Sequence, residues 1–492
     1  MNLATSKSVN NITILLIVVF FLYVLVTSLI NGGRWDLNEQ IAFGQRLIEG
    51  VSAYANGRDD LFFPSSPYFP GVGYLSYFYN ALGLTDIQAN NQFMLFSAVS
   101  IGFAYFIMLY KLTLLIYPKI SKGIVLTILT LFFTTHFPSY LSYMKEFKPD
   151  TILLLIGLIG LFIIENKDKN NILYFIYLGF LLFIATFFKQ SFFIIYFLVY
   201  LLIFFHETMT INRKIGLIIS YSLIGVFALF VIFDIENIYY FTVEALSKHP
   251  MASMEWIVYS IGYGTIRNSL FFLAILYFLY KRYKYFSFMK LESKYFIFAL
   301  IWFLFSALST AKEGGNVGNY EAGIVVLVPF AIFAINDIFQ KWYKQKYFNY
   351  LVLSTLTVGV LAYSYGLVKN SFELIDKTNQ DAISLEYITT NFSNKNALID
   401  GNSYILAKKA GLQILTEVET VGHLNSVPNY DMSALKNAIK QQKYNVVFLG
   451  NYFSGFQDKE INEIFDKKYQ LLDDSNIPTH LMGKVYIQRK EN

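Results

Sequence analysis

The chain alternates long apolar runs with short polar connections. The first apolar run covers residues 12–30 and ends at the polar sequence NGGRWD. A helix of about 20 apolar residues crosses the roughly 30 Å hydrocarbon core of a bilayer. The pattern predicts eleven membrane spans, near residues 12–30, 93–116, 123–141, 150–165, 172–188, 190–206, 215–233, 265–280, 295–310, 320–336 and 347–368.

The spacing of these runs gives two further expectations. The fifth and sixth spans nearly touch, which predicts a helical hairpin with its tip at Lys189–Gln190. The first run has no small-residue cleavage pattern after it, so we interpret it as a retained span and not as a signal peptide.

The tail over residues 369–492 has a different pattern. It mixes strand-like pieces (ALID, YNVVFLG, KVYIQ) with helix-like pieces (DMSALKNAIKQQ, KEINEIFDKKY). Such alternation is typical of an α/β domain. The predicted fold class is therefore a polytopic α-helical membrane protein, with a transmembrane domain over residues 1–368 and a small C-terminal α/β domain over residues 369–492.

The segment after the first span, residues 31–92, predicts two interfacial helices. After Trp35, the apolar residues Leu37, Ile41, Ile48 and Val51 share one helical face, as in an amphipathic helix that lies in the membrane interface. Three prolines then interrupt the chain. The apolar stretch GVGYLSYFYNAL is too short to span and predicts the second helix.

Composition supports a membrane protein and excludes some chemistry. Of the 492 residues, 55% are hydrophobic and 15% charged, far from the usual balance of a soluble domain. The absence of cysteine excludes disulfides, iron–sulfur clusters and thiolate zinc sites. The net charge of +5 lies mostly in loops, which indicates orientation in a bilayer and no binding to nucleic acid.

Charge asymmetry between the loops predicts the orientation. Lysine and arginine are more numerous, and the loops shorter, on the side that holds the N-terminus. The positive-inside rule then places the N-terminus in the cytoplasm. With an odd number of spans, the segment 31–92 and the C-terminal domain lie on the outer face.

Charged and polar residues gather at the predicted outer ends of the spans. Lys189 is the most informative, because four aromatic residues surround it in FFKQSFF. Ionisable groups close to hydrocarbon are costly and usually serve a site. For each lysine alone, an equal alternative is that it reaches outward to the lipid headgroups. The whole set favours a site: Asp36, Glu39, Lys148, Asp150, Lys189, Arg267, Lys312, Asn319 and Tyr320.

Two of these stretches also have a plain structural interpretation. Asp36 and Glu39 stand in DLNE, which has the spacing of a helix N-cap, although capping and catalysis are compatible. The sequence GGNVGNY, which holds Asn319 and Tyr320, could form an ordinary glycine-rich turn. Its position beside Lys312 and Glu313 favours contact with a substrate.

The order of these motifs resembles the C-type membrane glycosyltransferases. The shared features are an early outward acidic residue, an amphipathic helix, a segment with tyrosine and prolines, an LGLTD turn, and the later stretches KEFKPDTILLL, FFKQSFF and KEGGNVGNYEAG. The resemblance covers about residues 10–370. A single acidic residue at Asp36, in place of an adjacent acidic pair, departs from the protein O-mannosyltransferases and looks closer to the bacterial branch that includes the aminoarabinose transferases.

The resemblance implies a function and a location. It implies a polyprenyl-phosphate-linked sugar donor, an acceptor (glycan, lipid or protein) on the outer face, and inversion at the anomeric carbon. It also implies that Asp36 matches the catalytic aspartate of the family, and that the chain lies in a bacterial plasma (inner) membrane and serves glycan biosynthesis in the cell envelope.

The chemistry of such a transfer fits the residue types. The acceptor hydroxyl loses a proton as it attacks, and a positioned carboxylate can take that proton. The lipid phosphate leaves with developing negative charge, which Lys148, Lys189, Arg267 or Lys312 would stabilise. No cofactor is expected, because these cations suffice. A divalent cation held by Asp36, Glu39 or Asp150 is the alternative, but no histidine pair has metal-ligand spacing.

Two other functions compete with this interpretation. A transporter or flippase of lipid-linked glycans would place its charges and helix breaks near mid-membrane and often contains repeated halves. Here the charges cluster at one face and the two halves do not match. A polysaccharide polymerase or ligase is also an enzyme of the outer face. Such enzymes are expected to carry their large outer loop late in the chain, whereas here the conspicuous one follows the first span.

Overall fold

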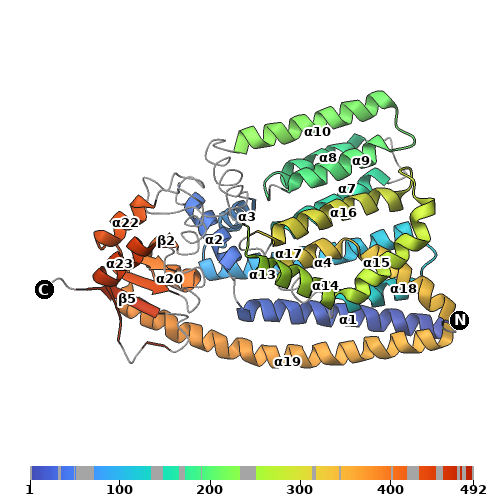
Figure 1. Ribbon diagram of the computed structural model, residues 1–492. Helices are drawn as coiled ribbons and strands as arrows, with labels where there is room; N and C mark the ends of the chain where they lie inside the picture. Colours follow the sequence, from blue (N-terminus) through green and yellow to red (C-terminus); the bar gives the residue numbers. More distant parts are fainter. Residues whose placement is uncertain are drawn as a thin grey trace. The chain divides into compact units, whose positions relative to one another are not determined.

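The computed structural model is largely helical and ends in a small β-sheet (Figure 1). It divides into two compact units. The first comprises residues 1–26, 98–231 and 251–370, and the second residues 27–97, 232–250 and 371–492. The structure describes residues 3–31, 35–48, 50, 71–133, 148–165, 172–189, 191–232, 251–312, 317–342, 345–399, 403–417, 432–449, 458–473, 477–478 and 484–489.

The first unit contains most of the predicted spans as apolar helices. Its helices lie wholly or partly within the unit: α1 (Leu3–Asn31), α4 (Ile87–Ile116), α5 (Lys122–Leu131), α7 (Pro149–Glu165), α8 (Ile172–Ala185), α9 (Phe192–Phe204), α10 (Ile211–Ile232), α13 (Met254–Ile257), η3 (Val258–Gly262), α14 (Tyr263–Arg267), α15 (Ser269–Arg282), η4 (Tyr283–Tyr285), α16 (Leu291–Thr310), α17 (Val317–Val325), α18 (Val328–Trp342) and α19 (Gln345–Phe392).

These helices make the protein a multi-pass membrane protein. Among the described residues, four helices are long and apolar enough to cross a bilayer alone: Asn11–Ile30, Ile87–Ile116, Ile211–Phe230 and Leu291–Thr310. Shorter apolar helices include α5, α8 and α9. The α8–α9 hairpin has its turn at the predicted tip before Ser191. The full count of eleven spans stays a prediction, because parts of the chain lie outside the described residues.

Two predicted single spans are broken helices. The span predicted at 320–336 bends by 56° between α17 and α18. Pro329 lies at the start of α18 and has no N–H for the carbonyl four residues earlier, at Val325, where α17 ends. The neighbouring Val326 carbonyl instead accepts a hydrogen bond from the Tyr295 hydroxyl at 3.0 Å.

The second broken span is the one predicted at 265–280. It bends by 71° between α13–α14 and α15. Asn268 interrupts the helix with φ −100° and ψ 20°, and its amide nitrogen donates to the Gly264 carbonyl at 2.8 Å. The backbone N–H of Asn268 donates to the same carbonyl at 3.1 Å, so Gly264 accepts two hydrogen bonds at the break. The π-helical turn η3 lies just before this break.

Partly buried ion pairs join the helix ends opposite to the Lys189 hairpin. Lys294, at the start of α16, lies 3.5 Å from Glu165 at the end of α7. Arg282, at the end of α15, lies 3.5 Å from Glu292, which also accepts a hydrogen bond from the Tyr117 hydroxyl. These contacts connect α7, α15 and α16, and the residue that follows α4, at one end of the unit.

The second unit is built around two short helices, α2 (Trp35–Ile48) and α3 (Gly71–Ala81). Both helices predicted for the segment after the first span are therefore present. They approach closely at Gly44, where an added Cβ would lie 2.7 Å from the Ser76 Cβ and 2.8 Å from the Gly73 carbonyl. Ser76 in turn exchanges two hydrogen bonds with Asn90 of α4, each 3.0 Å long.

The surroundings of α2 differ from the prediction of a helix with a solvated polar face. Leu37 and Ile41 are buried as expected, but Asn38, Gln40 and Arg46 are buried as well. The reason is that α2 contacts both α3 and the C-terminal helix α20 (Tyr404–Lys409). Lys409 of α20 also donates a hydrogen bond to Gln88 of α4.

The C-terminal part contains the predicted α/β domain. Its sheet has the order β2-β1-β3-β5-β4, with β1 parallel to β2 and β3, and β5 antiparallel to β3 and β4. Its elements are β1 (Asn396–Ile399), α20, β2 (Gln413–Glu417), α22 (Ser433–Lys440), β3 (Val446–Leu449), α23 (Lys459–Lys468), β4 (Tyr469–Leu471) and β5 (Lys484–Gln488). The strands are short, and β3 is buried along its whole length.

The helix α19 continues through residue 368, so the domain boundary expected there lies inside a helix.

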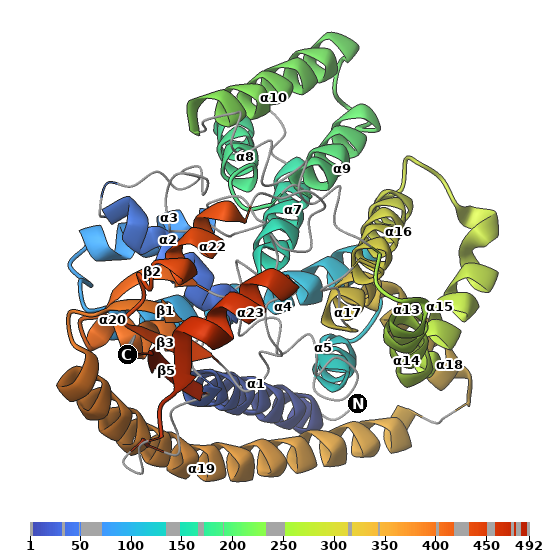
Figure 2. The same cartoon turned by 60° about the vertical axis from the view of Figure 1, so that its left-hand side comes forward.

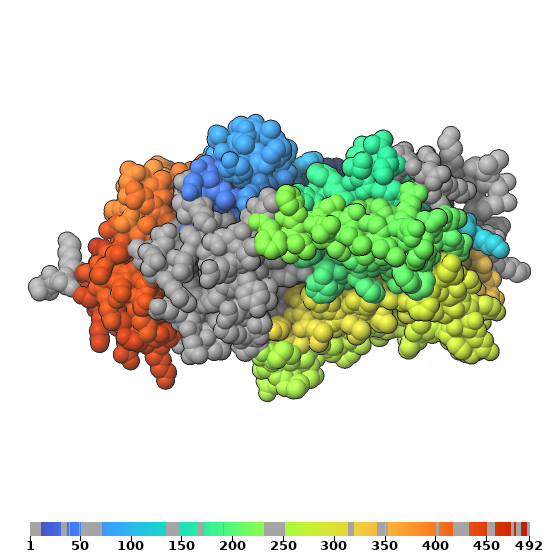
Figure 3. Space-filling view, turned by 90° about the horizontal axis from the view of Figure 1, so that it is seen from above, coloured from blue at the N-terminus to red at the C-terminus, as the bar shows by residue number. Residues whose placement is uncertain are grey.

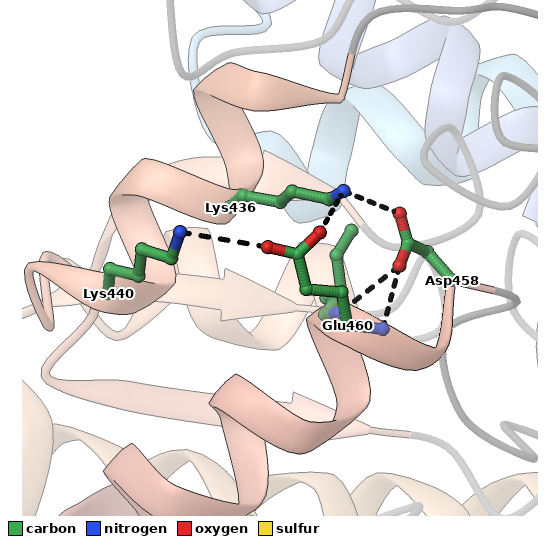
Figure 4. A network of polar contacts seen from close by, with 5 residues as sticks. Lys436, Lys440, Asp458 and Glu460 are labelled. Carbon is green, nitrogen blue, oxygen red and sulfur yellow. Dashed lines mark hydrogen bonds and ion pairs between the residues drawn. The ribbon is translucent and has the colours of Figure 1, made fainter.

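Ion pairs connect the helices α22 and α23: Lys436 lies 2.9 Å from Asp458 and 2.8 Å from Glu460 (Figure 4). Asp458 also caps α23 by accepting the backbone N–H groups of Glu460 and Ile461.

Candidate active site

The start of α7 carries two of the predicted site residues. Pro149 is the first residue of the helix, where its missing N–H costs nothing. Asp150 follows in the first turn, where the positive end of the helix dipole favours a carboxylate. Lys148 and Asp150 are both buried. The sequence KPD thus fixes a charged pair at one end of an otherwise apolar helix.

Lys189, at the tip of the α8–α9 hairpin, pairs with this aspartate. Its Nζ donates to Asp150 Oδ2 at 2.7 Å, with both side chains largely buried. The Ser191 hydroxyl donates to the other carboxylate oxygen at 3.3 Å. Lys189 and Asp150 therefore meet between α7 and α9, and Lys148 precedes the same aspartate by two residues.

Arg267 forms a second ion pair, with Glu321 of α17. The Nη1 atom of Arg267 lies 3.6 Å from Glu321 Oε1, and the glutamate side chain is fully buried. The arginine side chain is 27% exposed. Because 3.6 Å exceeds hydrogen-bond range, the guanidinium keeps donors that can meet an anion. Its carbon also lies 5.9 Å from the centre of the Tyr263 ring.

Tyr320 packs against the same broken helix. Its hydroxyl is 2.8 Å from the Thr265 hydroxyl, and its side chain is buried. At Gly264 an added Cβ would lie 2.6 Å from the Tyr320 ring, so glycine is required for α14 and α17 to meet. Asn319 precedes Tyr320 on α17 and is half-buried.

Lys312 lies just after α16. It forms a single antiparallel bridge with Met251, and the Ala252 N–H donates to the Ala311 carbonyl at 3.0 Å. This pairing fixes the chain that enters α13 beside the end of α16. The structure therefore pairs Lys189 with Asp150, and Arg267 with Glu321, the residue after Tyr320. Lys312 lies apart from both pairs, in the backbone bridge with Met251.

Asp36 and Glu39 belong to the second unit, whereas the other predicted site residues belong to the first. Helix α2 begins at Trp35, so Asp36 lies within its first turn and not at the position before it. The side chains of Asp36 and Glu39, and all of Lys145, Glu146 and Glu313, lie outside the described residues. The roles predicted for these residues stay predictions.

Two residues that contact the predicted site residues were not predicted: Glu321, which pairs with Arg267, and Ser191, which donates to Asp150. Glu321 stands in NYEAG, where a carboxylate at the start of an apolar segment is a signal of a site. Ser191 carried no signal, because serine is common in apolar helices. Both became visible only through the tertiary packing of α9 on α7 and of α17 on α14.

A metal site has little support in the described part of the chain. Within it, no three histidine, aspartate or glutamate side chains gather as ligands. The side chains of Asp36 and Glu39 lie outside that part. A divalent cation held by these carboxylates therefore stays a prediction from the sequence.

Comparison with known proteins gives a structural match only. No protein-family model matches the chain, and no curated protein matches its sequence. Among solved structures, it is similar to ArnT from Cupriavidus metallidurans in the apo state, with a TM-score of 0.56. The match covers 96% of this chain and 97% of that one, at 10% sequence identity.

The match confirms the fold expected from the motifs. It extends over both units and includes the C-terminal α/β domain. A match at this level of identity establishes the fold and does not assign a role to any residue.

Proposed function

We propose that this protein is a membrane glycosyltransferase that moves a sugar from a polyprenyl phosphate to an acceptor on the outer face of the membrane. The observation that supports this most is the fold shared with ArnT along nearly the whole chain. ArnT is an aminoarabinose transferase of the C-type glycosyltransferase family. The acceptor is a glycan, a lipid or a protein.

Asp36 is the general base in this proposal. A carboxylate in the first turn of α2 would take the proton of the acceptor hydroxyl as the oxygen attacks the anomeric carbon, an effect of about 10²–10⁴ in rate. The burial of α2 against α3 and α20 supports this role, because a base must be held rigidly. Attack opposite to the departing phosphate inverts the anomeric centre.

Arg267 is the first candidate for binding the leaving phosphate. Its guanidinium is partly exposed and lies beyond hydrogen-bond distance from Glu321, which leaves a fork of donors for phosphate oxygens. Glu321, fully buried, would orient the arginine. Asn319 and Tyr320 precede Glu321 on α17 and would contact the donor sugar.

The Lys148, Asp150 and Lys189 group supports the same chemistry. Its lysines suit a lipid phosphate at the membrane surface, and Asp150 keeps Lys189 in place. Lys312 is the fourth cation, and Glu39 would contact the substrate beside Asp36. The N-terminus is cytoplasmic and the C-terminal domain extracytoplasmic in this proposal, in a bacterial plasma membrane.

One observation favours a second candidate function, the transport of lipid-linked glycans. The two broken helices, bent by 71° and 56°, carry Arg267 and Glu321 beside their breaks. Discontinuous helices with charged residues are typical of transporter binding sites. A transporter would move the lipid-linked sugar without cleaving its phosphate bond.

A reconstituted transfer assay separates the two functions. Purified full-length protein in nanodiscs is given polyprenyl-phosphate sugar and acceptor, and released polyprenyl phosphate is measured. Asp36→Asn is the informative variant, because asparagine has nearly the shape of aspartate but its amide does not take up a proton. We expect normal folding and a loss of phosphate release. Asp86→Asn, at the cap of α4, is the matched control and keeps activity.

A further inference from the structure

Helix α19 exposes one apolar face along much of its length. The exposed apolar side chains on this face follow one another at spacings of three and four residues, and each is 57–73% exposed: Val358, Leu361, Tyr365, Val368, Phe372 and Ile375. These are the first and fourth positions of successive heptads, the pattern by which one helix packs along another. Figures 1 and 2 both show the first half of α19 beside α1, with no described helix on its other side.

The opposite face of α19 packs on the rest of the chain. In the first half of the helix, the centres of the Tyr363 and Phe20 rings lie 5.0 Å apart, which joins α19 to α1. In the last turns, Ile388 is buried, and the centres of the Phe392 and Phe448 rings lie 5.9 Å apart. At about 100° per residue, these packed positions lie on the side of the helix opposite to the exposed stripe. The stripe is therefore a second and separate face.

A bilayer can cover only part of this stripe. Helix α19 has 48 residues and is about 72 Å long, whereas the hydrocarbon core is roughly 30 Å thick. The span expected at residues 347–368 ends before Phe372 and Ile375. Ile383 is 56% exposed and lies about 22 Å beyond the end of that span. Apolar side chains at that distance from hydrocarbon mark a surface that another protein covers.

Helix α10 shows the contrast. It also exposes an apolar face, which Figure 3 shows uncovered along its length, but its apolar segment Ile211–Phe230 has 20 residues, the length of one bilayer crossing. Lipid alone covers such a face. The stripe of α19 continues past that length, where the exposed carboxylates of Glu373 and Asp376 flank it. An apolar stripe between polar flanks is typical of an interface between helices.

The stripe contains one polar position, Asn379, which follows Ile375 by four residues and is exposed. It takes the first position of its heptad. In a parallel pair of helices, a single asparagine at that position meets the same asparagine of the other helix and fixes the register. A second copy of this chain presents such a helix, because α19 runs in the same direction through the membrane in every copy.

The charges beside the stripe also fit a second copy. In a parallel pair, the seventh position of one heptad faces the fifth position of the next heptad of the other helix. Lys369 would then face Ser364 of the other copy, and Asp376 would face Ser371. Like charges therefore do not meet along this contact.

We propose that α19 pairs in parallel with α19 of a second copy of this chain, which makes the protein a dimer with its two-fold axis along the membrane normal. Phe372, Ile375 and Asn379 form the part of the contact outside the bilayer, and the stripe from Val358 to Val368 continues it within the bilayer. The inference does not rest on the proposed function, because the pattern and exposure of α19 carry it.

Cysteine cross-linking in membranes tests the pairing. The natural chain has no cysteine, so each single-cysteine variant of the full-length protein reports one position. A disulfide needs Cα atoms about 4.4–6.8 Å apart, which the facing positions of paired helices can supply. Under mild oxidation, Ile375→Cys should form a covalent dimer of twice the chain mass. Glu373→Cys, exposed on another side of the same turn, is the matched control and should stay monomeric.

Native mass spectrometry of the protein in nanodiscs gives a second readout. The wild type should be a dimer, and Ile375→Glu should lose the dimer, because two carboxylates would face each other. This variant should keep its circular dichroism spectrum, because Ile375 is 60% exposed in the single chain. Asn379→Leu should keep the dimer and make it more resistant to detergent, because the asparagine fixes register at a cost in stability.

Three results would overturn the proposal. The first is a wild-type monomer at every protein concentration, which would leave lipid as the cover of the stripe. The second is equal cross-linking of Ile375→Cys and Glu373→Cys, which would indicate random collision. The third is a cross-link from Ile375→Cys only to a protein of another mass, which would assign the stripe to a different partner.

Discussion

Lys189 Nζ donates to Asp150 Oδ2 at 2.7 Å, joining the tip of the α8–α9 hairpin to the first turn of α7. Both side chains are largely buried, so each charge depends on the other. Removal of one partner from a buried pair typically costs about 3–5 kcal/mol, because the remaining charge is left in a medium of low polarity.

We therefore expect Asp150→Ala to lower the thermal stability of the detergent-solubilised protein sharply. The double variant with Lys189→Met should be more stable than the sum of the single effects implies. Thermal unfolding of the four proteins measures this coupling. Additive losses would mean that the two side chains do not depend on each other.

Arg267 offers a test of phosphate binding with a matched control at the other end of the unit. Arg267→Met should lower kcat strongly, because a cation that meets the leaving group acts only as charge develops there. Arg282→Met removes a comparable ion pair, at 3.5 Å from Glu292, away from the site. It should affect stability and leave kcat nearly unchanged. Equal kinetic losses in both variants would remove Arg267 from the site.

The contact at Gly44 links packing to the candidate base. An added methyl group would meet Ser76 and the Gly73 carbonyl at under 3 Å, which forces α2 away from α3. Gly44→Ala should destabilise the protein by about 1–3 kcal/mol and lower transfer activity, since α2 carries Asp36. Gly216→Ala in α10 has open space around it and should be neutral or slightly stabilising. Stability and activity assays on both variants measure the contrast.

The charged cluster of the C-terminal domain predicts a pH dependence. Hydrogen bonds from Lys436 lower the pKa of Asp458 and the pKa of Glu460 below their ordinary values of 3.8 and 4.5. The stabilisation is therefore present above these ordinary values and is lost as pH falls through the lowered ones. Protection of the amides in α22 and α23 against hydrogen exchange, relative to the intrinsic exchange rate at each pH, should fall between about pH 5 and about pH 3.

Lys436→Met supplies the comparison for this pH dependence. Without the lysine, exchange should be faster at neutral pH and should change less in acid. A variant with an acid response as steep as that of the wild type would show that other carboxylates carry the dependence. Lys395→Met, a lysine outside the cluster, is a suitable control.

Much of the architecture could be predicted from the sequence, for physical reasons. Long apolar runs between polar connections gave the hairpin at Lys189 and the helices around it, because bilayer thickness fixes their length. The alternation in the tail gave β1, β3, β5, α22 and α23. The breaks were missed because hydropathy does not report backbone geometry: Pro329 lies inside an apolar run, and Asn268 lies in the short polar stretch at the edge of the other predicted span.

The site could be predicted only in part. Charges in apolar surroundings drew attention to Lys189, Asp150 and Arg267, because their placement is costly without a partner. Which charge meets which depends on tertiary packing, so the pairing of Arg267 with Glu321 was not foreseen. The burial of Arg46 and Asn38 on α2 was missed for the same reason, because α20 follows far along the chain and contacts α2 only in the fold.

The most direct test of the central claim is the glycan profile of cells that lack this protein, measured by mass spectrometry. The account predicts that one sugar disappears from the surface glycans, returns with the wild-type gene, and stays absent with Asp36→Asn expressed at a normal level. If Asp36→Asn restores the sugar, Asp36 is not the base. If no sugar changes while lipid-linked precursors accumulate, the protein is a transporter and the account is contradicted.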